Sequence, residues 1–219
     1  MTQQIALVSR AGEIGPKQLA RAAAALNTQL RRDFAPVWSI DAQVTTSMRV
    51  PETAWPLIVS DDASGAGVHT DADGRPVAYV DYADDWTKAA SHELLEMCAD
   101  PYGTRLVTAR AVKAGQGRVD YLVEVCDPCE AVGYEIDGIA VSDFYTPHYF
   151  DPAPRDGVRY SHTGAITRPR QVLRGGYLSW RVPSTGEWWQ QLWLEGPRPV
   201  FRNLGVLELG RREAAELVS

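Results

Sequence analysis

One short segment, Ser-His-Glu-Leu-Leu-Glu at residues 91–96, constrains this chain more than any other, because it places metal-binding side chains within a predicted helix. Asp84 or Asp85 offers an N-cap, and alanines that favour a helix follow. Pro101 cannot continue a helix, so the sequence predicts one over about residues 85–99.

Within that helix, His92 and Glu96 are four residues apart and therefore lie one above the other on the same face. Glu93 is one position round from His92. Apolar residues fall on the opposite face, where they can pack into a core: Ala90, Leu94, Met97 and Cys98.

The spacing His-Glu-x-x-Glu is similar to the His-Glu-x-x-His motif of the zincins, in which two residues bind zinc and the Glu acts as the base. Here Glu96 replaces the second His, and zinc also accepts a carboxylate oxygen. We therefore expect His92 and Glu96 to bind zinc and Glu93 to be the catalytic base. The alternative is a solvated, charged helix face. Against it, Lys88 is the only Lys or Arg between residues 76 and 104.

A third ligand is needed, because a catalytic zinc site combines three protein ligands with one open position. The strand-like segment 119–125 runs into a group of acids about 30 residues after His92. Glu124 is the first choice, because it alternates with two valines whose side chains would enter the core. Asp127 is the second choice, although its place beside Pro128 also suits a turn.

The three cysteines allow two further hypotheses, a redox dithiol and a structural zinc site. Cys126 and Cys129 form a Cys-x-x-Cys pair, but a redox dithiol needs this pair at a helix N-terminus, and the strand-like residues 134–136 leave no room for a helix. A structural zinc needs four soft ligands, so a His would have to join Cys98 and the pair. We expect buried thiols instead.

The composition is that of an ordinary globular protein, with 219 residues, 45% of them hydrophobic and 23% charged. It has no apolar run of membrane-spanning length, and residues 1–10 are too short and polar for a secretory signal. An odd number of Cys does not suggest disulfides, so a cytoplasmic location is expected. The net charge of −6 argues against a nucleic-acid partner, and no membrane partner is expected.

The charge is unevenly distributed along the chain. Residues 1–150 carry 12 Lys and Arg against 21 Asp and Glu, whereas residues 151–181 carry six Arg against two Asp. The change coincides with the proline-rich stretch 151–154. We therefore expect a main domain over residues 1–150 and an Arg- and Trp-rich β appendage over residues 151–219.

The order of elements predicts an α+β fold. A strand at residues 5–9 precedes a helix from Pro16 to about Asp33, and two Asp-Gly pairs predict tight hairpins. A helix, several strands and then a ligand-bearing helix at the sheet edge is the order of a zincin catalytic domain. The other expected strands lie at residues 38–48, 55–60, 68–70, 76–82, 105–113, 119–125, 134–136, 139–142, 177–182 and 187–194.

These motifs together carry a resemblance that covers about residues 30–150. The stretches 91–101 and 124–129 look like the pattern S-H-E-x-x-E-x-x-x-D-P followed by G-E-I-x-D-x-C of HExxE zincin-like proteins. That group includes bacterial and fungal metallopeptidase-like proteins and plant exordium-like proteins. Val123 stands where the group has Gly. A set of uncharacterised bacterial proteins is more fully similar, including the stretches 33–38 and 141–144.

The resemblance implies a zincin-like metallopeptidase domain with a defined division of roles. His92, Glu96 and either Glu124 or Asp127 would hold the zinc, and Glu93 would be the base.

Two histidines outside the helix are further candidates. His69 lies on the strand-loop-strand segment before the helix, where zincins pair their substrate as an extra strand, so it could line the cleft. His148 could stabilise a tetrahedral oxyanion if its loop folds over the metal. An ordinary surface or packing role is the alternative for each. Four Trp within residues 180–193 leave core packing and a partner-binding face both open.

Three functions therefore compete. The main prediction is a zinc-dependent hydrolase, a metallopeptidase acting on peptides or proteins. The second is a catalytically silent zincin-like binding or assembly protein that contacts a protein partner through its C-terminal segment. The third is a stable fold without metal, in which the carboxylates are solvated.

Overall fold

The structure is a computed structural model that describes residues 2–61 and 67–207. The chain is α+β and divides into two compact units, one formed by residues 1–102 and 133–142 and the other by residues 103–132 and 143–219. The boundary predicted between residues 150 and 151 falls inside the second unit. Strand pairing explains the difference: β7 (Arg118–Leu122) pairs with β10 (Tyr177–Arg181), and local composition gives no signal of so distant a pairing.

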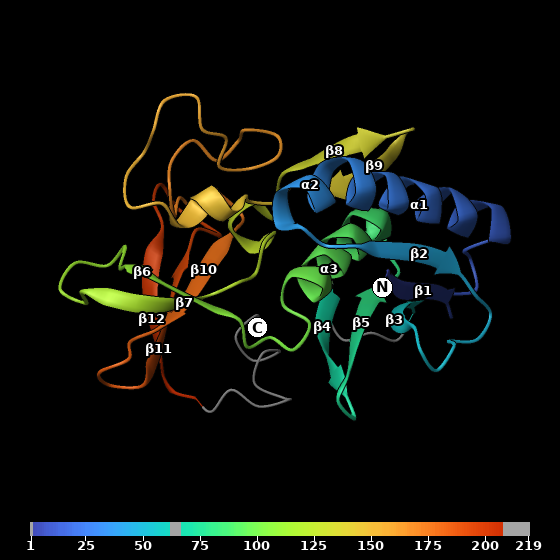
Figure 1. Cartoon of the computed structure of the whole chain (residues 1–219), viewed down its shortest axis with the longest axis horizontal. Coiled ribbons are helices and arrows are strands. Elements are labelled where there is room, and N and C mark those ends of the chain that lie inside the picture. The colour runs from blue at the N-terminus through green and yellow to red at the C-terminus, as the bar shows by residue number, and fades with distance from the viewer. Residues whose placement is uncertain (1, 62–66, 208–219) are drawn as a thin grey trace. The chain divides into compact units, whose positions relative to one another are not determined.

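The first unit is built on a five-stranded sheet with the order β2-β1-β3-β5-β4 (Figure 1). Four strands run parallel, and β4 is an antiparallel strand at one edge. Their bounds are β1 (Gln3–Ser9), β2 (Ala42–Thr46), β3 (Trp55–Ser60), β4 (Gly67–Ala72) and β5 (Arg75–Asp81).

Both predicted Asp-Gly hairpins are confirmed. Asp73 and Gly74 have φ of 54° and 79° between β4 and β5, and Asp137 and Gly138 have φ of 52° and 73° between β8 (Gly133–Ile136) and β9 (Ile139–Ser142). Positive φ at both central residues is the geometry of the two-residue turn that these sequences favour. The first turn places β4 antiparallel beside β5 and so fixes the sheet edge.

The first helix departs from its predicted course. α1 (Pro16–Thr28) continues as a π-helical segment, η1 (Gln29–Phe34), and then as the short α2 (Ala35–Trp38). The strand expected over residues 38–48 is therefore wrong at its start, because Trp38 is helical and β2 begins only at Ala42. The wider turn of a π segment breaks the 3.6-residue pattern from which the helix was extended to Asp33.

The ligand-bearing helix is α3 (Trp86–Ala99), within one residue of its prediction. It packs against β3, β4 and β5 on one side and β9 on another, and its predicted core residues Ala90, Leu94, Met97 and Cys98 are buried. Asp85 occupies the N-cap position, but its side chain makes no capping hydrogen bond there. Its carbonyl instead accepts the backbone N–H groups of Lys88 and Ala89.

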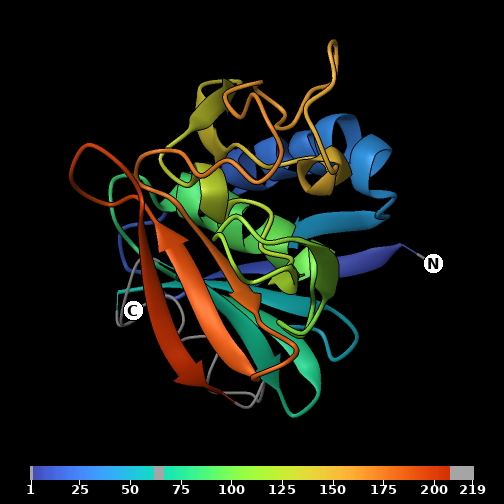
Figure 2. The same ribbon diagram turned by 90° about the vertical axis from the view of Figure 1, so that its left-hand side faces the viewer.

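The second unit contains an antiparallel sheet with the order β12-β11-β10-β7-β6, whose C-terminal strands are orange to red in Figure 2. The predicted C-terminal hairpin is confirmed as β10 and β11, and both Trp180 and Trp188 are fully buried, so these two rings serve packing. The other elements are β6 (Leu106–Arg110), β11 (Glu187–Leu192), β12 (Val200–Val206) and the 3₁₀ turns η2 (Asp127–Cys129) and η3 (Pro147–Phe150).

Among residues 2–61 and 67–207, no helix is long and apolar enough to cross a membrane.

Candidate metal centre

α3 brings the two predicted ligands together. The Nε2 atom of His92 lies 3.1 Å from the Oε2 atom of Glu96, as expected for residues one helical turn apart. Two atoms that bind one tetrahedral zinc at about 2.0–2.2 Å lie roughly 3.4 Å from each other. The observed separation is therefore close to that of two ligands on a single metal ion.

Glu93 lies beside this pair and against the edge strand β4. The Nδ1 atom of His69, on β4, is 3.5 Å from Oε2 of Glu93 and 3.8 Å from Oε2 of Glu96. His69, Glu93 and Glu96 are all at least nine-tenths buried, and the side chain of His92 is 13% exposed. The first unit thus gathers two imidazoles and two carboxylates in one place.

The charges of this cluster act on His69. Burial lowers the pKa of His69, but the hydrogen bond with Glu93 and the negative charges of Glu93, Glu96 and Asp100 raise it by more. Its pKa therefore lies above the ordinary value. The negative charges of Glu93, Glu96 and Asp100, which belong to the same unit, favour the protonated form of His69.

Burial excludes a solvated, charged helix face. Glu93 is 7% exposed and Glu96 is 3% exposed, whereas acids on a solvated helix face extend into water. Burying a carboxylate costs free energy unless it is paired, hydrogen-bonded or bound to a metal. The carboxylates of α3 are therefore part of a buried polar cluster rather than of a solvated surface.

A buried hydrogen-bond network fixes α3 at the residue before His92. The hydroxyl of Ser91 donates to Oε1 of Gln29 at 2.7 Å and accepts the N–H of Ser142 at 2.9 Å. The side-chain amide of Gln29 donates in turn to the carbonyl of Ser142 at 2.9 Å. Each of these three residues is fully buried, so the network joins η1, α3 and β9 and sets the rotation of the ligand-bearing helix.

The predicted third ligands belong to the second unit. β7 ends at Leu122 rather than near residue 125, so the expectation that a strand orients Glu124 is wrong in that detail. Val123 and Val125 are nevertheless fully buried and Glu124 is half-buried, in the expected alternation. Asp127 is buried at the start of η2. Which of the two acids is the third ligand stays a prediction.

His148 also lies in the second unit, on η3, with a side chain 51% exposed. Its Nδ1 atom is 3.2 Å from Oδ2 of Asp151 and 3.1 Å from a guanidinium nitrogen of Arg155. These contacts orient the ring within its own loop. Its role in stabilising an oxyanion stays a prediction.

The expectation that the three thiols are buried is confirmed. Cys98, Cys126 and Cys129 are all buried, and none of these three described residues is in a disulfide. Burial raises the pKa of the Cys98 thiol to about 12, so the metal-free thiol is protonated at neutral pH. Cys126 precedes the 3₁₀ turn η2 and Cys129 is its last residue, so the pair does not open an α-helix.

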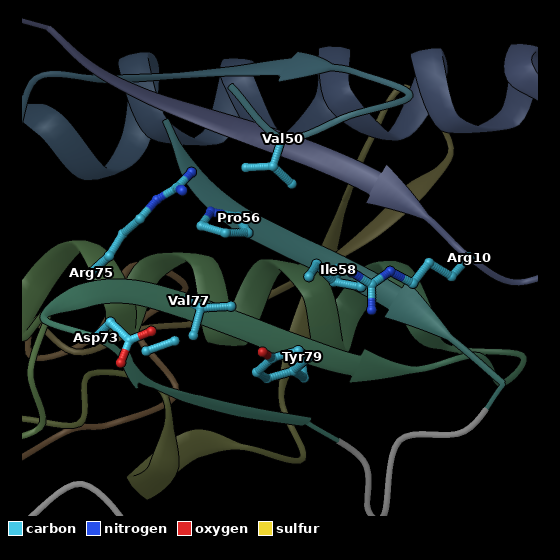
Figure 3. Close-up of a pocket in the computed structure, with 9 residues that line it drawn as sticks. Arg10, Val50, Pro56, Ile58, Asp73, Arg75, Val77 and Tyr79 are labelled. Atoms are coloured by element: carbon cyan, nitrogen blue, oxygen red, sulfur yellow. The ribbon is translucent and has the colours of Figure 1, made fainter. Parts of the chain in front are cut away.

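A pocket of about 390 Å³ in the first unit lies away from the candidate centre (Figure 3). Along β3 and β5 its lining residues alternate with the side chains that face α3, and Figure 3 shows the helices behind the strands. Among the described residues that line it, Asp73 is the only carboxylate and none is a His. These described residues are Arg10, Val50, Pro56, Ile58, Ala72, Asp73, Arg75, Val77 and Tyr79.

Two features of the centre were missed in the sequence. The strand expected at residues 68–70 leaves out Gly67, yet β4 begins at this residue, and a Cβ atom placed on it would lie 2.6 Å from Oε1 of Glu93. Its spacing of two residues from His69 is the one signal that both face the same way on a strand. Gln29 and its bond with Ser91 gave no sequence signal, because their separation of 62 residues carries no periodicity.

No protein-family model, no curated protein and no solved structure matches this chain.

Proposed function

We propose that this chain is a zinc-dependent hydrolase, a metallopeptidase whose first unit is a zincin-like domain. The observation that carries the proposal is the buried group of His92, Glu93 and Glu96 on α3, with the two predicted ligand atoms 3.1 Å apart. A helix face with this chemistry is costly to bury without a cation, which supports a metal-binding role.

The arrangement around α3 supports the same proposal. β4 is the antiparallel edge strand of the sheet, and α3 packs against it. In the zincins, which the sequence resembles, an extended substrate pairs with such a strand. A peptide would bind β4 through main-chain hydrogen bonds, the recognition mode of strand addition.

The donor set fits zinc. An imidazole nitrogen and carboxylate oxygens are ligands that zinc accepts, and the atoms of His92 and Glu96 already face one another. Zinc would supply Lewis acidity, which polarises a scissile carbonyl and lowers the pKa of water bound to the metal to about 7.

Within this chain, each residue of the cluster has a distinct task. His92 and Glu96 would bind the metal, with Glu124 or Asp127 as the third ligand. Glu93 would accept a proton from the attacking water and return it to the leaving amine, as a base and then an acid. The burial of Glu93 keeps bulk water from competing for that proton.

The test has two parts, metal content and turnover. Elemental analysis after mild purification should give about one zinc per chain, and a library of quenched fluorescent peptides should contain cleaved sequences. Glu93→Gln keeps the shape of the side chain but removes its basicity, so we expect zinc to stay bound while the rate falls about 100-fold or more. Retained activity in this variant would assign the proton transfer elsewhere.

A second candidate is a catalytically silent binding protein, and one observation favours it. The last described strand of the second unit exposes large apolar side chains, with Val200 at 56%, Phe201 at 43% and Val206 at 69%. Apolar side chains gathered on one edge strand suit a protein partner. Bound zinc without hydrolysis of any peptide in the library would favour this function.

A further inference from the structure

The edge strand β4 presents two residues to α3 at the place where Glu93 lies. Gly67 and His69 are two apart and therefore point to the same face of the sheet. Their partners on β5 are Val80 and Ala78, both fully buried. Because α3 packs on β4 and β5, this is the face that the helix covers.

Gly67 leaves the space that the carboxylate of Glu93 occupies. A Cβ atom on Gly67 would lie 2.6 Å from Oε1, 2.9 Å from Cγ and 3.1 Å from Cδ of Glu93. Real Cβ atoms essentially never show contacts as short as the first two distances, so with any side chain here either Glu93 or the strand must shift. The absence of a side chain lets this carboxylate lie directly against the strand.

His69 contacts the other oxygen of the same carboxylate. Its Nδ1 atom lies 3.5 Å from Oε2 of Glu93, and both side chains are buried. A ring that carries a proton on Nδ1, whether neutral or charged, donates toward that oxygen. Glu93 is thus held between the backbone at Gly67 and the imidazole of His69.

We propose that Gly67 and His69 are positioning residues that fix the carboxylate of Glu93 for its role as the catalytic base. The role of Glu93 as a catalytic base rests on the proposed function, but its contact with Gly67 and His69 can be tested without measuring turnover. A base must be held within hydrogen-bond reach of the proton it takes, and a side chain with three rotatable bonds needs such constraints.

The first experiment is a stability cycle between Gly67→Ala and Glu93→Ala. Gly67→Ala should lower the Tm by about 2–4 °C when Glu93 is present. It should lower it by less than about 1 °C in the Glu93→Ala background, where the displaced atoms are gone. Effects of alanine on the unfolded chain are the same in both backgrounds and cancel.

Gly12→Ala is the matched control, because a Cβ atom on Gly12 meets nothing within 4 Å and its φ is not in the left-handed region. Its effect on Tm should not depend on Glu93. Equal costs of Gly67→Ala with and without the Glu93 carboxylate would overturn the proposal.

The second experiment compares His69→Asn with His69→Leu. The amide nitrogen of Asn can take the place of Nδ1, whereas Leu removes the donor. We expect both variants to keep zinc, His69→Leu to lower kcat about 10–100-fold with little change in KM, and His69→Asn to keep most of kcat. Loss of zinc in both variants would make His69 a ligand and overturn its positioning role.

The two experiments separate the positioning role from the proposed function. Coupling in the stability cycle without hydrolysis by the parent protein supports the contact and counts against the peptidase. Hydrolysis without coupling, or with equal kcat for His69→Leu and His69→Asn, counts against the positioning role alone.

Discussion

At the scale of single residues, burying the two acids of α3 carries a free-energy cost that the fold must offset. Glu93 and Glu96 are buried within three residues of one another on one helix. Each buried carboxylate costs several kcal/mol unless a positive group compensates it. His69 and His92 supply part of that compensation, and a divalent metal would supply the rest.

His92→Ala and Glu96→Ala should therefore each reduce zinc content and thermal stability together. Metal that binds only the native state stabilises it by about 2.7 kcal/mol at a hundredfold excess over Kd. Thermal unfolding with and without added zinc should show a stabilising shift in the parent and none in either variant. His162→Ala is the control for loss of an imidazole and should keep the parent's zinc stoichiometry. Unchanged zinc in both ligand variants would reject the site.

For the third ligand, we expect Glu124→Ala to remove zinc and Asp127→Ala to keep it. The reason is that Glu124 alternates with buried Val123 and Val125, whereas Asp127 opens a 3₁₀ turn beside Pro128. Zinc content of the two variants, followed by a metal-loaded crystal structure, decides between them. A zinc–carboxylate distance of about 2.0–2.2 Å at Asp127 would reverse the choice.

The sequence predicted the pairing of His92 with Glu96 because helical periodicity links residues four apart. It indicated that His69 could line the cleft, but it could not predict that His69 lies 3.5 Å from Glu93, because 24 residues and the β4–β5 hairpin separate them. The proximity follows from the edge position of β4, which depends on strand pairing. Local patterns thus identify the residues that share a helix face, but they do not identify the strand that packs against that face.

At the scale of elements, the Ser91 network determines how α3 is rotated. The helix is enclosed by the sheet on one side and by β9 on another, so small rotations would move His92 and Glu96 together. Ser91 holds both Gln29 and Ser142 from the position next to His92.

Ser91→Ala should destabilise the protein by about 1–3 kcal/mol, because it leaves a buried carbonyl oxygen and a buried N–H without their partner. Chemical denaturation measures this change. Thr87→Ala is the matched control, since Thr87 also donates from α3 to β9, at Ala140, but from an exposed position. Its cost should stay within about 0.5 kcal/mol. Equal costs for the two variants would contradict a special role for the network.

Element types were predicted well where periodicity or turn chemistry is strong. The α3 helix and both Asp-Gly hairpins were placed correctly, because a proline after a helix and the residues of positive-φ turns are local signals. The predicted extents failed at η1 and at the end of β7. The π-helical turns of η1 do not keep the 3.6-residue period, and the alternation of buried residues continues past Leu122, where β7 ends.

At the scale of the whole molecule, the chain passes between the two units three times, after residues 102, 132 and 142. Composition suggested a simple boundary at residue 150, because charge and proline content change there. Sheet pairing joins residues on both sides of residue 150, since β7 pairs with β6 on one side and with β10 on the other.

A chain that ends at residue 150 should therefore not contain a fully folded second unit. Without β10, the buried Tyr121 loses its paired residue Trp180, whose ring lies 5.8 Å from its own. We expect increased binding of a hydrophobic dye and a broader thermal transition than in the full chain. Adding back a 151–219 fragment serves as the control. A sharp transition and no dye binding in the short chain would support the boundary at residue 150.

Because the chain passes between the two units three times, the order of synthesis also limits when each part of the first unit can fold. Ser91 and Gln29 emerge from the ribosome long before Ser142, their third partner, is made. α3 therefore waits half-covered while residues 103–132, which belong elsewhere, are added. At about 5–20 residues per second, that interval lasts a few seconds. During it the nascent chain lacks β9, so the side of α3 that β9 covers in the finished unit has no partner strand, whereas β3, β4 and β5 have already been made.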